Sequence, residues 1–207
     1  FMKKKIIIFI PSIEEGGVEK NLYIVTNYLN NNGIKIDILT INHDKKSKFK
    51  KGIKFIGISN PYLYKKGRLI KYLVSSIALF FKLLTSKDKP LVFAFQANIY
   101  AILIAKIFST KIITRSNAAH AGWSKNVLKN FLYKFLINLA DDVMVNSIEF
   151  KKKFEKNFKK KVECIYNPFD KNLIKKNLSN KKKNTFRAKN HLNLVSVGRL
   201  TDQKDHL

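Results

Sequence analysis

The residues best suited to binding an anion lie in a glycine turn near the start of the chain. Gly16 and Gly17 follow the apolar, β-branched run 5–10, which is typical of a strand covered on both faces. From Val18 to Leu29, apolar side chains recur at helical spacing on one face. A turn of this kind directs backbone N–H groups outward at the positive end of a helix dipole. The segment predicts a phosphate-facing turn, and the alternative is a connecting turn that binds no ligand.

Two common nucleotide-binding motifs do not fit this turn. A dinucleotide fingerprint requires G-x-G-x-x-G, and a P-loop requires G-x-x-x-x-G-K-[ST]. Residues 14–20 read EEGGVEK and match neither pattern. The sequence therefore argues against a nicotinamide-dependent enzyme and against a P-loop kinase or ATPase.

Polar residues also gather after an expected strand in the middle of the chain. Strand 111–115 ends in Arg115, and Asn117 and His120 follow it. In open α/β sheets, ligands bind beyond the carboxyl ends of the strands. Arg115 and Asn117 are therefore candidates for lining a pocket or ordering a loop. His120 is the histidine best placed for proton transfer, and the alternative is a solvated loop residue.

The hydrophobic pattern predicts a scaffold for these groups. Short β-branched segments alternate with longer segments of helical periodicity, which is the order of βαβ units in a parallel sheet. The expected strands are 5–10, 34–41, 53–58, 91–95, 111–115, 142–147 and 162–166. The predicted fold class is α/β, with a Rossmann-like parallel sheet that has helices on both faces.

The composition changes after residue 170. Lys and Asn dominate residues 171–190, as in a linker, and strand character resumes at residues 191–197. We expect an N-terminal domain at 1–170 and a basic linker at 171–190. Residues 191–207 are expected to form the first strand and phosphate-binding loop of a truncated second domain.

Two of the expected helices carry pronounced apolar stripes. The helix at 68–86 has one stripe and a basic entry, and it is expected to cover the sheet or to lie against a membrane surface. Its stripe consists of Leu69, Leu73, Ile77, Phe80 and Leu84. The helix that follows Ser124, its expected N-cap, has a stripe that we expect to be buried. That stripe consists of Val127, Phe131, Leu132, Phe135 and Leu139.

The chain is strongly basic. Lys and Arg number 41 against 14 Asp and Glu, so the formal net charge is +27. Such a charge attracts polyanions: nucleic acid, anionic lipid or phosphorylated substrates. A biased composition without a specific partner is the alternative. Because the lysines are scattered and RRM, KH and zinc-finger signatures are absent, a nucleic-acid partner is not expected.

Cysteine content and hydropathy indicate in which cellular compartment the protein is expected. Cys164 is the only cysteine, so an intrachain disulfide is excluded and a reducing compartment is favoured. No signal peptide is evident, and charged residues interrupt every long apolar run. We expect a cytoplasmic protein that is soluble or peripheral at the inner face of the plasma membrane.

Four motifs in this order resemble a known family. They are Gly16–Lys20, Arg115–Asn117, Ile165–Asp170 and Val197–Lys204. Together they resemble the retaining glycosyltransferases of family 4, which have the GT-B fold. The resemblance extends along the whole chain but covers only about half of such an enzyme. It implies two facing Rossmann-like domains, the second holding most of a nucleotide-sugar donor and the first holding the acceptor.

The resemblance also implies residues that bind the donor. By position, Gly16 and Gly17 would face the donor diphosphate and the reacting sugar, and Arg199 and Lys204 match the pair that grips the diphosphate. The chemistry agrees, because fixed cations stabilise a nucleoside diphosphate that leaves with growing negative charge. Arg199 can contact two phosphate oxygens as a fork, with Lys204 as a point charge.

Acceptor binding is expected from Glu19, Arg115 and Asn117, and catalysis from His120. Residues 141–142 are not the Asp-x-Asp of metal-dependent glycosyltransferases, because they precede a strand and are expected to cap or solvate its turn. No His, Cys or Asp cluster has the spacing of metal ligands. The family resemblance likewise implies a metal-independent enzyme without a cofactor.

The predicted function is transfer of a sugar from a nucleotide-sugar donor, with retention, to a cell-envelope glycan or a polyprenyl- or lipid-linked acceptor. This is the chemistry of polysaccharide and lipopolysaccharide biosynthesis. The carboxylates expected to hold the donor sugar and ribose lie beyond Leu207, so the chain alone is expected to bind donor poorly and not to turn over. Two alternatives stay open: a basic nucleic-acid-binding module and a non-catalytic sugar-binding module.

Overall fold

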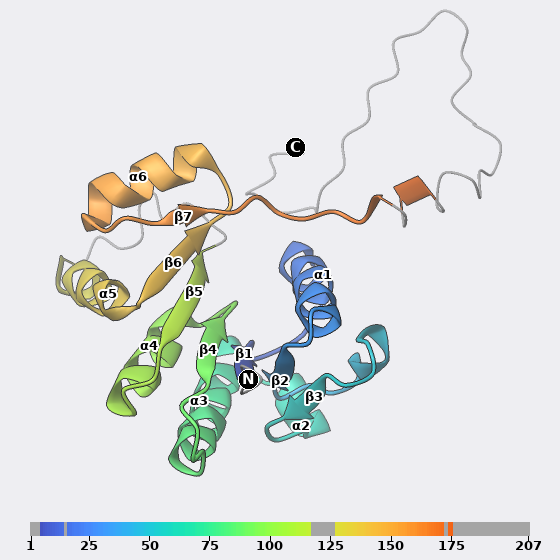
Figure 1. Cartoon of the computed structure of the whole chain (residues 1–207). Helices are drawn as coiled ribbons and strands as arrows, with labels where there is room; N and C mark the ends of the chain where they lie inside the picture. The colour runs from blue at the N-terminus through green and yellow to red at the C-terminus, as the bar shows by residue number, and fades with distance from the viewer. Residues whose placement is uncertain (1–4, 15, 117–126, 172–173, 176–207) are drawn as a thin grey trace, which may run out of the picture. The chain divides into compact units, whose positions relative to one another are not determined.

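The computed structural model describes residues 5–14, 16–116, 127–171 and 174–175 (Figure 1). The chain divides into two compact units, Phe1–Phe169 and Asp170–Leu207. In the second unit only residues 170, 171, 174 and 175 are described. The expected linker at 171–190 lies almost wholly outside the described residues and the expected strand at 191–207 wholly outside them, so this division into domains stays a prediction.

The first unit is built on a parallel sheet of seven strands. The strands are β1 Lys5–Phe9, β2 Lys35–Leu39, β3 Lys54–Ile56, β4 Leu91–Ala94, β5 Ile112–Ser116, β6 Asp142–Val145 and β7 Glu163–Cys164. Their order across the sheet is β3-β2-β1-β4-β5-β6-β7, and every neighbouring pair is parallel. The predicted α/β fold with a Rossmann-like parallel sheet is confirmed.

Helices connect the strands and cover both faces of the sheet. They are α1 Gly17–Asn31, the 3₁₀ turn η1 Lys46–Lys48, α2 Pro61–Tyr64, α3 Arg68–Leu84, α4 Asn98–Ile107, α5 Val127–Leu139 and α6 Ile148–Phe158. On one face, α1 packs over β1 and β2 through Leu22. On the other face, α3, α4, α5 and α6 form a row, as Figure 1 shows. None of the helices in the described part of the chain is both long and apolar enough to cross a membrane.

Strand β1 shows why the sheet is covered on both faces. Ile7 and Phe9 point into the core beneath α3 and α4, whereas Ile6 and Ile8 point into the core beneath α1. All four are buried, as the continuous apolar run predicted. Burying a side chain of this size stabilises the fold by about 1.5–3 kcal/mol.

Helix α3 packs on the sheet with a face that its periodicity did not predict. Its buried residues are Ser75, Ser76, Leu79 and Leu83. The Ser75 Oγ–H donates to the Pro11 carbonyl at 3.4 Å, so the small serines let the helix approach the end of β1. Most of the expected stripe, including Leu69 at 68% exposure, faces outward instead.

Helix α5 likewise corrects an expectation. Its sheet-facing residues are Leu136 and Ile137, which are buried, whereas Phe131 is 67% exposed. Leu132, Phe135 and Leu139 of the expected buried stripe are exposed as well. Apolar residues occupy nearly every side of α5, so the spacing alone was compatible with two orientations of the helix on the sheet. In the structure the side with Leu136 and Ile137 meets the sheet, and the side with the predicted stripe faces outward.

Candidate active site

The strand order places a candidate site at the carboxyl ends of β1 and β4. From β1 the chain continues to β2 and β3 on one side of the sheet, and it then returns to β4 on the other side. The connections after β1 and β4 lead to α1 and α4, which cover opposite faces of the sheet. This switch point is where open α/β sheets bind ligands.

The glycine turn lies at this edge, as the sequence predicted. Gly16 has extended backbone and immediately precedes α1, and both Gly16 and Gly17 are exposed. A Cβ at position 17 would have no atom within 4 Å, so the space in front of Gly17 is open. The N–H groups of the first turn of α1 are directed toward the same edge. Binding of a donor diphosphate here stays a prediction.

Glu19 lies in this first turn, but its side chain is turned back into the protein. It is 5% exposed, and its Oε2 lies 2.8 Å from the point that a Cβ of residue 16 would occupy. Glu19 is the third residue of the helix, the position from which a capping glutamate reaches the helix start. A carboxylate there is stabilised by the helix dipole. This placement is the one expected of a capping glutamate, and acceptor binding by Glu19 stays a prediction.

Helix α3 contributes a cation and a tyrosine that the sequence analysis did not single out. The Lys71 Nζ lies 3.1 Å from Glu14 Oε1, so α3 is tied to the loop after β1. Tyr72 lies in the same turn, and its ring centroid is 5.8 Å from that of Tyr100 in α4. Burial raises the pKa of Tyr72, with Glu14 and Tyr100 adding to the rise and Arg68 opposing it. No local pattern marks these residues, because their position depends on how α3 packs.

Arg115 is the most deeply buried cation at this edge among the residues that the structure describes. It is 3% exposed, and its Nη2 donates to Asn167 Oδ1 at 2.6 Å. Its guanidinium carbon lies 5.8 Å from the centroid of the Phe95 ring, and burial lowers the pKa of Arg115. An arginine nevertheless stays charged at physiological pH. Arg115 therefore joins the end of β5 to the turn after β7, which fits the loop-ordering alternative, and its acceptor-binding role stays a prediction.

The turn between β4 and α4 has two unusual features. Ala97 adopts a left-handed backbone with φ 54° and ψ 39°. The next residue, Asn98, donates through Nδ2 to the Arg115 carbonyl at 3.0 Å, while its buried Oδ1 accepts no hydrogen bond. Strained backbone and an unsatisfied buried acceptor are both costly, and such features concentrate at functional sites. The sequence placed residues 96–98 only at the end of a strand, so this part of the site was missed.

Four predicted site residues lie outside the described residues. They are Asn117, His120, Arg199 and Lys204. Their roles in acceptor binding, catalysis and diphosphate binding stay predictions. Within the described ranges, no group of three or more His, Cys, Asp or Glu residues could hold a metal ion. Metal independence stays a prediction too.

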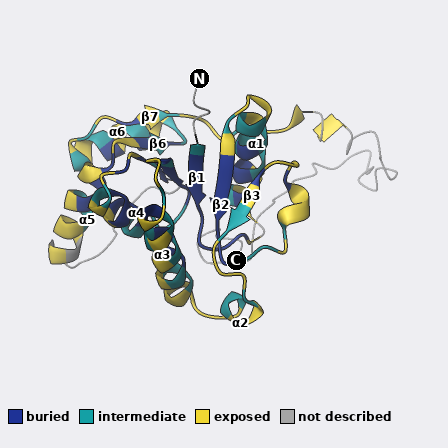
Figure 2. Ribbon diagram, turned by 60° about the horizontal axis from the view of Figure 1, so that its bottom comes forward, coloured by how far each residue is buried: buried dark blue, intermediate teal, exposed yellow. Residues whose placement is uncertain are grey.

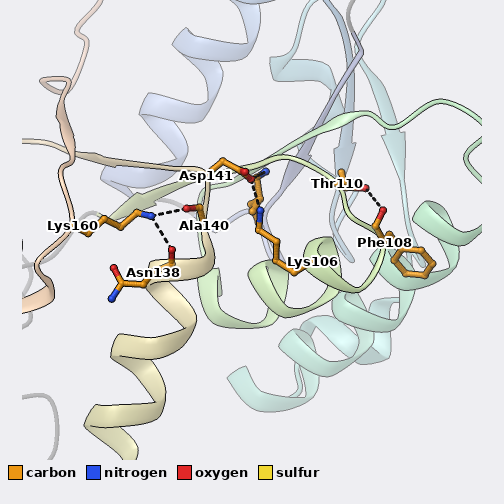
Figure 3. A network of polar contacts seen from close by, with 8 residues as sticks. Lys106, Phe108, Thr110, Asn138, Ala140, Asp141 and Lys160 are labelled. Atoms are coloured by element: carbon orange, nitrogen blue, oxygen red, sulfur yellow. Dashed lines mark hydrogen bonds and ion pairs between the residues drawn. The ribbon is translucent and has the colours of Figure 1, made fainter.

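Asp141 lies at the opposite, amino-terminal edge of the sheet, where it joins the start of β5 to α4, and the expected capping of its own turn stays a prediction. Its Oδ2 accepts from the Ile112 N–H at 2.7 Å and from Lys106 Nζ at 2.7 Å (Figure 3). Partial burial raises the pKa of Asp141, but these two donors outweigh burial and lower it overall. Lys160 Nζ donates to the carbonyls of Asn138 and Ala140 nearby. The cluster is structural and separate from the candidate site.

Comparisons with known proteins show the fold. No family model and no curated protein matches the sequence. HepE from Anabaena, solved in complex with UDP and glucose, aligns with 82% of this chain and 46% of its own, at 17% identity and a TM-score of 0.59. UGT2 from Phytolacca americana, solved with UDP-2fluoro-glucose and pterostilbene, aligns with 88% of this chain and 58% of its own, at 11% identity and a TM-score of 0.56.

This chain thus spans about half the length of its solved neighbours. At these identities the likeness concerns the fold alone. HepE and UGT2 are GT-B glycosyltransferases. The chain has the Rossmann-like parallel α/β fold that these GT-B glycosyltransferases contain.

Proposed function

We propose that this chain is the acceptor-side half of a family 4-like GT-B glycosyltransferase. The whole enzyme would transfer a sugar from a nucleotide-sugar donor, with retention of configuration, to a cell-envelope glycan or a polyprenyl- or lipid-linked acceptor. The observation that carries the proposal is the exposed Gly16–Gly17 turn at the switch point of the sheet, with open space in front of Gly17. The solved neighbours support it, since HepE was crystallised with UDP and glucose.

In this proposal each half of the site binds the donor with different groups. The backbone N–H groups around Gly16 and Gly17 lie against the donor, and Arg199 and Lys204 of the second half grip its diphosphate. Charge that develops on the departing nucleoside diphosphate is stabilised by these fixed donors and cations. Asn117 and His120 contact the acceptor or the reacting sugar. The reaction requires neither a metal nor a cofactor and takes place at the cytoplasmic face of the membrane.

Lys71 adds a cation that the first half supplies by itself. The Lys71 side chain is largely buried and is paired with the exposed Glu14, so its ammonium group is held at the edge of the glycine turn. An anionic donor that binds there would compete with Glu14 for Lys71. The pair would then open on binding, which makes Lys71 a candidate donor ligand in this half of the site.

The net charge of +27 favours a second candidate, a nucleic-acid-binding α/β module. Ligand-binding experiments can distinguish the two functions. Salt-sensitive binding of random RNA, together with no response to UDP- or GDP-sugars, would favour the module over the transferase.

The test is an activity assay of the complete gene product with a Gly17→Leu substitution. Release of UDP or GDP from a panel of nucleotide sugars is measured with a membrane lipid extract as acceptor. The leucine side chain has room in the protein itself, so folding should be preserved while the ligand space is filled. We expect activity to fall at least ~100-fold, since a misplacement of about 1 Å already costs 10²-fold.

The matched control is Asn157→Leu, which adds a similar side chain at an exposed position near the end of α6. It should leave activity unchanged. If the wild-type protein uses none of the nucleotide sugars, or if Gly17→Leu is as active as wild type, the proposal is wrong.

A further inference from the structure

Helices α3, α4 and α5 expose a continuous apolar surface on one side of the sheet. We call it the α3–α5 surface. On α3 it is formed by Leu69, Leu73, Ile77, Phe81 and Leu84, all of which are more than half exposed. These residues are spaced by four, four, four and three positions, so they form one stripe along the helix. The residues that bind α3 to the sheet, such as Leu79, lie on its other side.

The stripe on α3 continues onto its neighbours. α4 packs against both α3 and α5, and all three helices lie on the same face of the sheet. The outward residues of α4 and α5 include Leu103, Ile107, Phe131, Phe135 and Leu139. Figure 2 shows exposed residues along the outer sides of α3 and α5. Single exposed apolar residues are ordinary, but a contiguous group across three helices marks an interaction surface.

The charge of these helices indicates the chemistry of the partner. α3, α4 and α5 contain no Asp or Glu, whereas α1 contains Glu19 and α6 contains Glu149 and Glu155. The charged residues of α3–α5 are all Lys or Arg, and exposed Lys65, Lys66 and Arg68 lie at the entry to α3. Lysines around an apolar surface can bury their stems and keep their ammonium groups at a polar boundary. A partner with an apolar interior and an anionic boundary matches this arrangement.

We infer that the α3–α5 surface docks on an anionic phospholipid bilayer, with its apolar residues in the outer part of the acyl region and its lysines among the head groups. Amphipathic helices that lie in the membrane plane have this combination of residues. A second copy of the chain fits less well, because a symmetric contact would bring the lysines of both copies together. The inference concerns a surface outside the candidate active site and does not depend on the proposed transferase activity.

Docking in this orientation has a consequence for the candidate site. The first turn of α3 holds Lys71 against Glu14, next to the glycine turn. A bilayer against α3 would therefore lie beside the carboxyl edge of the sheet. A lipid-linked molecule held in that bilayer could reach the edge without leaving the membrane.

The test is co-sedimentation of the full 207-residue chain with vesicles of phosphatidylethanolamine and phosphatidylglycerol. The double variant Ile77→Asp, Phe135→Asp should bind at least ~10-fold more weakly, because each substitution removes a large apolar side chain from the contact. Lys65→Gln and Lys66→Gln should each weaken binding about five-fold, as expected for one lysine near an anionic surface. Vesicles of pure phosphatidylcholine should bind far less chain.

The matched control is Tyr28→Asp, which adds a carboxylate at an exposed aromatic residue on α1, on the other face of the sheet. It should bind like wild type. Helical circular dichroism is recorded for each variant, and Ile77→Ser with Phe135→Ser replaces any aspartate variant that has lost its signal.

Three outcomes overturn the inference. The first is equal binding of the double variant and the wild type, which would place the contact elsewhere. The second is equal binding to phosphatidylcholine, which would remove the role of anionic lipid. The third is no vesicle binding together with a dimer that the double variant converts to a monomer in sedimentation, which would assign the surface to a second copy.

Discussion

The contact between Arg115 and Asn167 joins two distant motifs, and its removal has a predictable cost. The Asn167 Oδ1 accepts from the buried guanidinium at 2.6 Å. A hydrogen bond to a charged group contributes about 1.5–3 kcal/mol. Asn167→Ala should therefore lower the free energy of unfolding by about 2 kcal/mol, because it removes an acceptor from a buried charge. With a urea slope of roughly 2 kcal/mol per M, the unfolding midpoint should fall by about 1 M.

A double-mutant cycle with Arg115→Met isolates this contact. If the two side chains stabilise the fold through each other, the coupling energy should be about 1.5–3 kcal/mol, within the range found for residues in contact. Asn157→Ala on the exposed side of α6 is the control and should change stability by less than about 0.5 kcal/mol. A coupling energy near zero would refute the reasoning, because it would show that Arg115 and Asn167 act independently.

The Asn167→Asp variant gives the same contact a dependence on pH. An aspartate beside the guanidinium should have a pKa below its ordinary value, and at neutral pH it should add about 1 kcal/mol, since position 167 is exposed. This gain should be present above the ordinary pKa of aspartate and should disappear as the pH falls through the lowered pKa. Urea titrations of the variant and wild type at neutral and acidic pH measure the difference.

Three further predictions test the packing of the fold. Because its donors hold the pKa of Asp141 low, Asp141→Asn should lower the free energy of unfolding by about 1 kcal/mol at neutral pH. This loss of stability should shrink as the pH falls through the lowered pKa. Thermal melts at two pH values check this, and a loss that is constant with pH would contradict it. Gly57→Ala should lower the free energy of unfolding by about 3 kcal/mol, because the φ of Gly57 is 110° and a Cβ would lie 2.7 Å from the Thr40 carbonyl oxygen. Gly17→Ala should leave stability nearly unchanged, so similar melting temperatures for the two variants would contradict this contrast. Leu79→Ala should cost about 2–5 kcal/mol and Ile77→Ala less than about 0.5 kcal/mol in urea unfolding, and the reverse order would mean that α3 packs through its other face.

The scaffold was predictable because local patterns determine it. All seven strands of the first unit were expected from apolar, β-branched runs, with their ends within a few residues. The glycine turn was placed correctly because it lies between the first of these runs and a segment of helical periodicity. Asn60 and Pro61 were read only as a strand breaker, yet Asn60 Oδ1 accepts from the Tyr62 N–H and begins α2.

The orientation of helices and the contacts across the site were not predictable from local patterns. α3 and α5 have apolar residues on two sides, so their periodicity could not tell which side meets the sheet. Ser75 of α3 is buried and bonds to the Pro11 carbonyl just after β1, which no helical pattern reveals. The contact from Arg115 to Asn167 joins residues 52 positions apart, so no local pattern indicates it. The buried Asn98 Oδ1 lacks a hydrogen-bond partner because of how the surrounding elements pack, which the sequence around Asn98 does not reveal.

The most direct test is to map which backbone amides of the complete gene product exchange more slowly when a nucleotide sugar binds. Hydrogen exchange is compared with and without a UDP- or GDP-sugar that the protein binds. We predict slower exchange at the amides of residues 16–20 and 96–100, on either side of the switch point. Binding that leaves these amides unchanged and protects only other segments would contradict the claim that this edge of the sheet is the site.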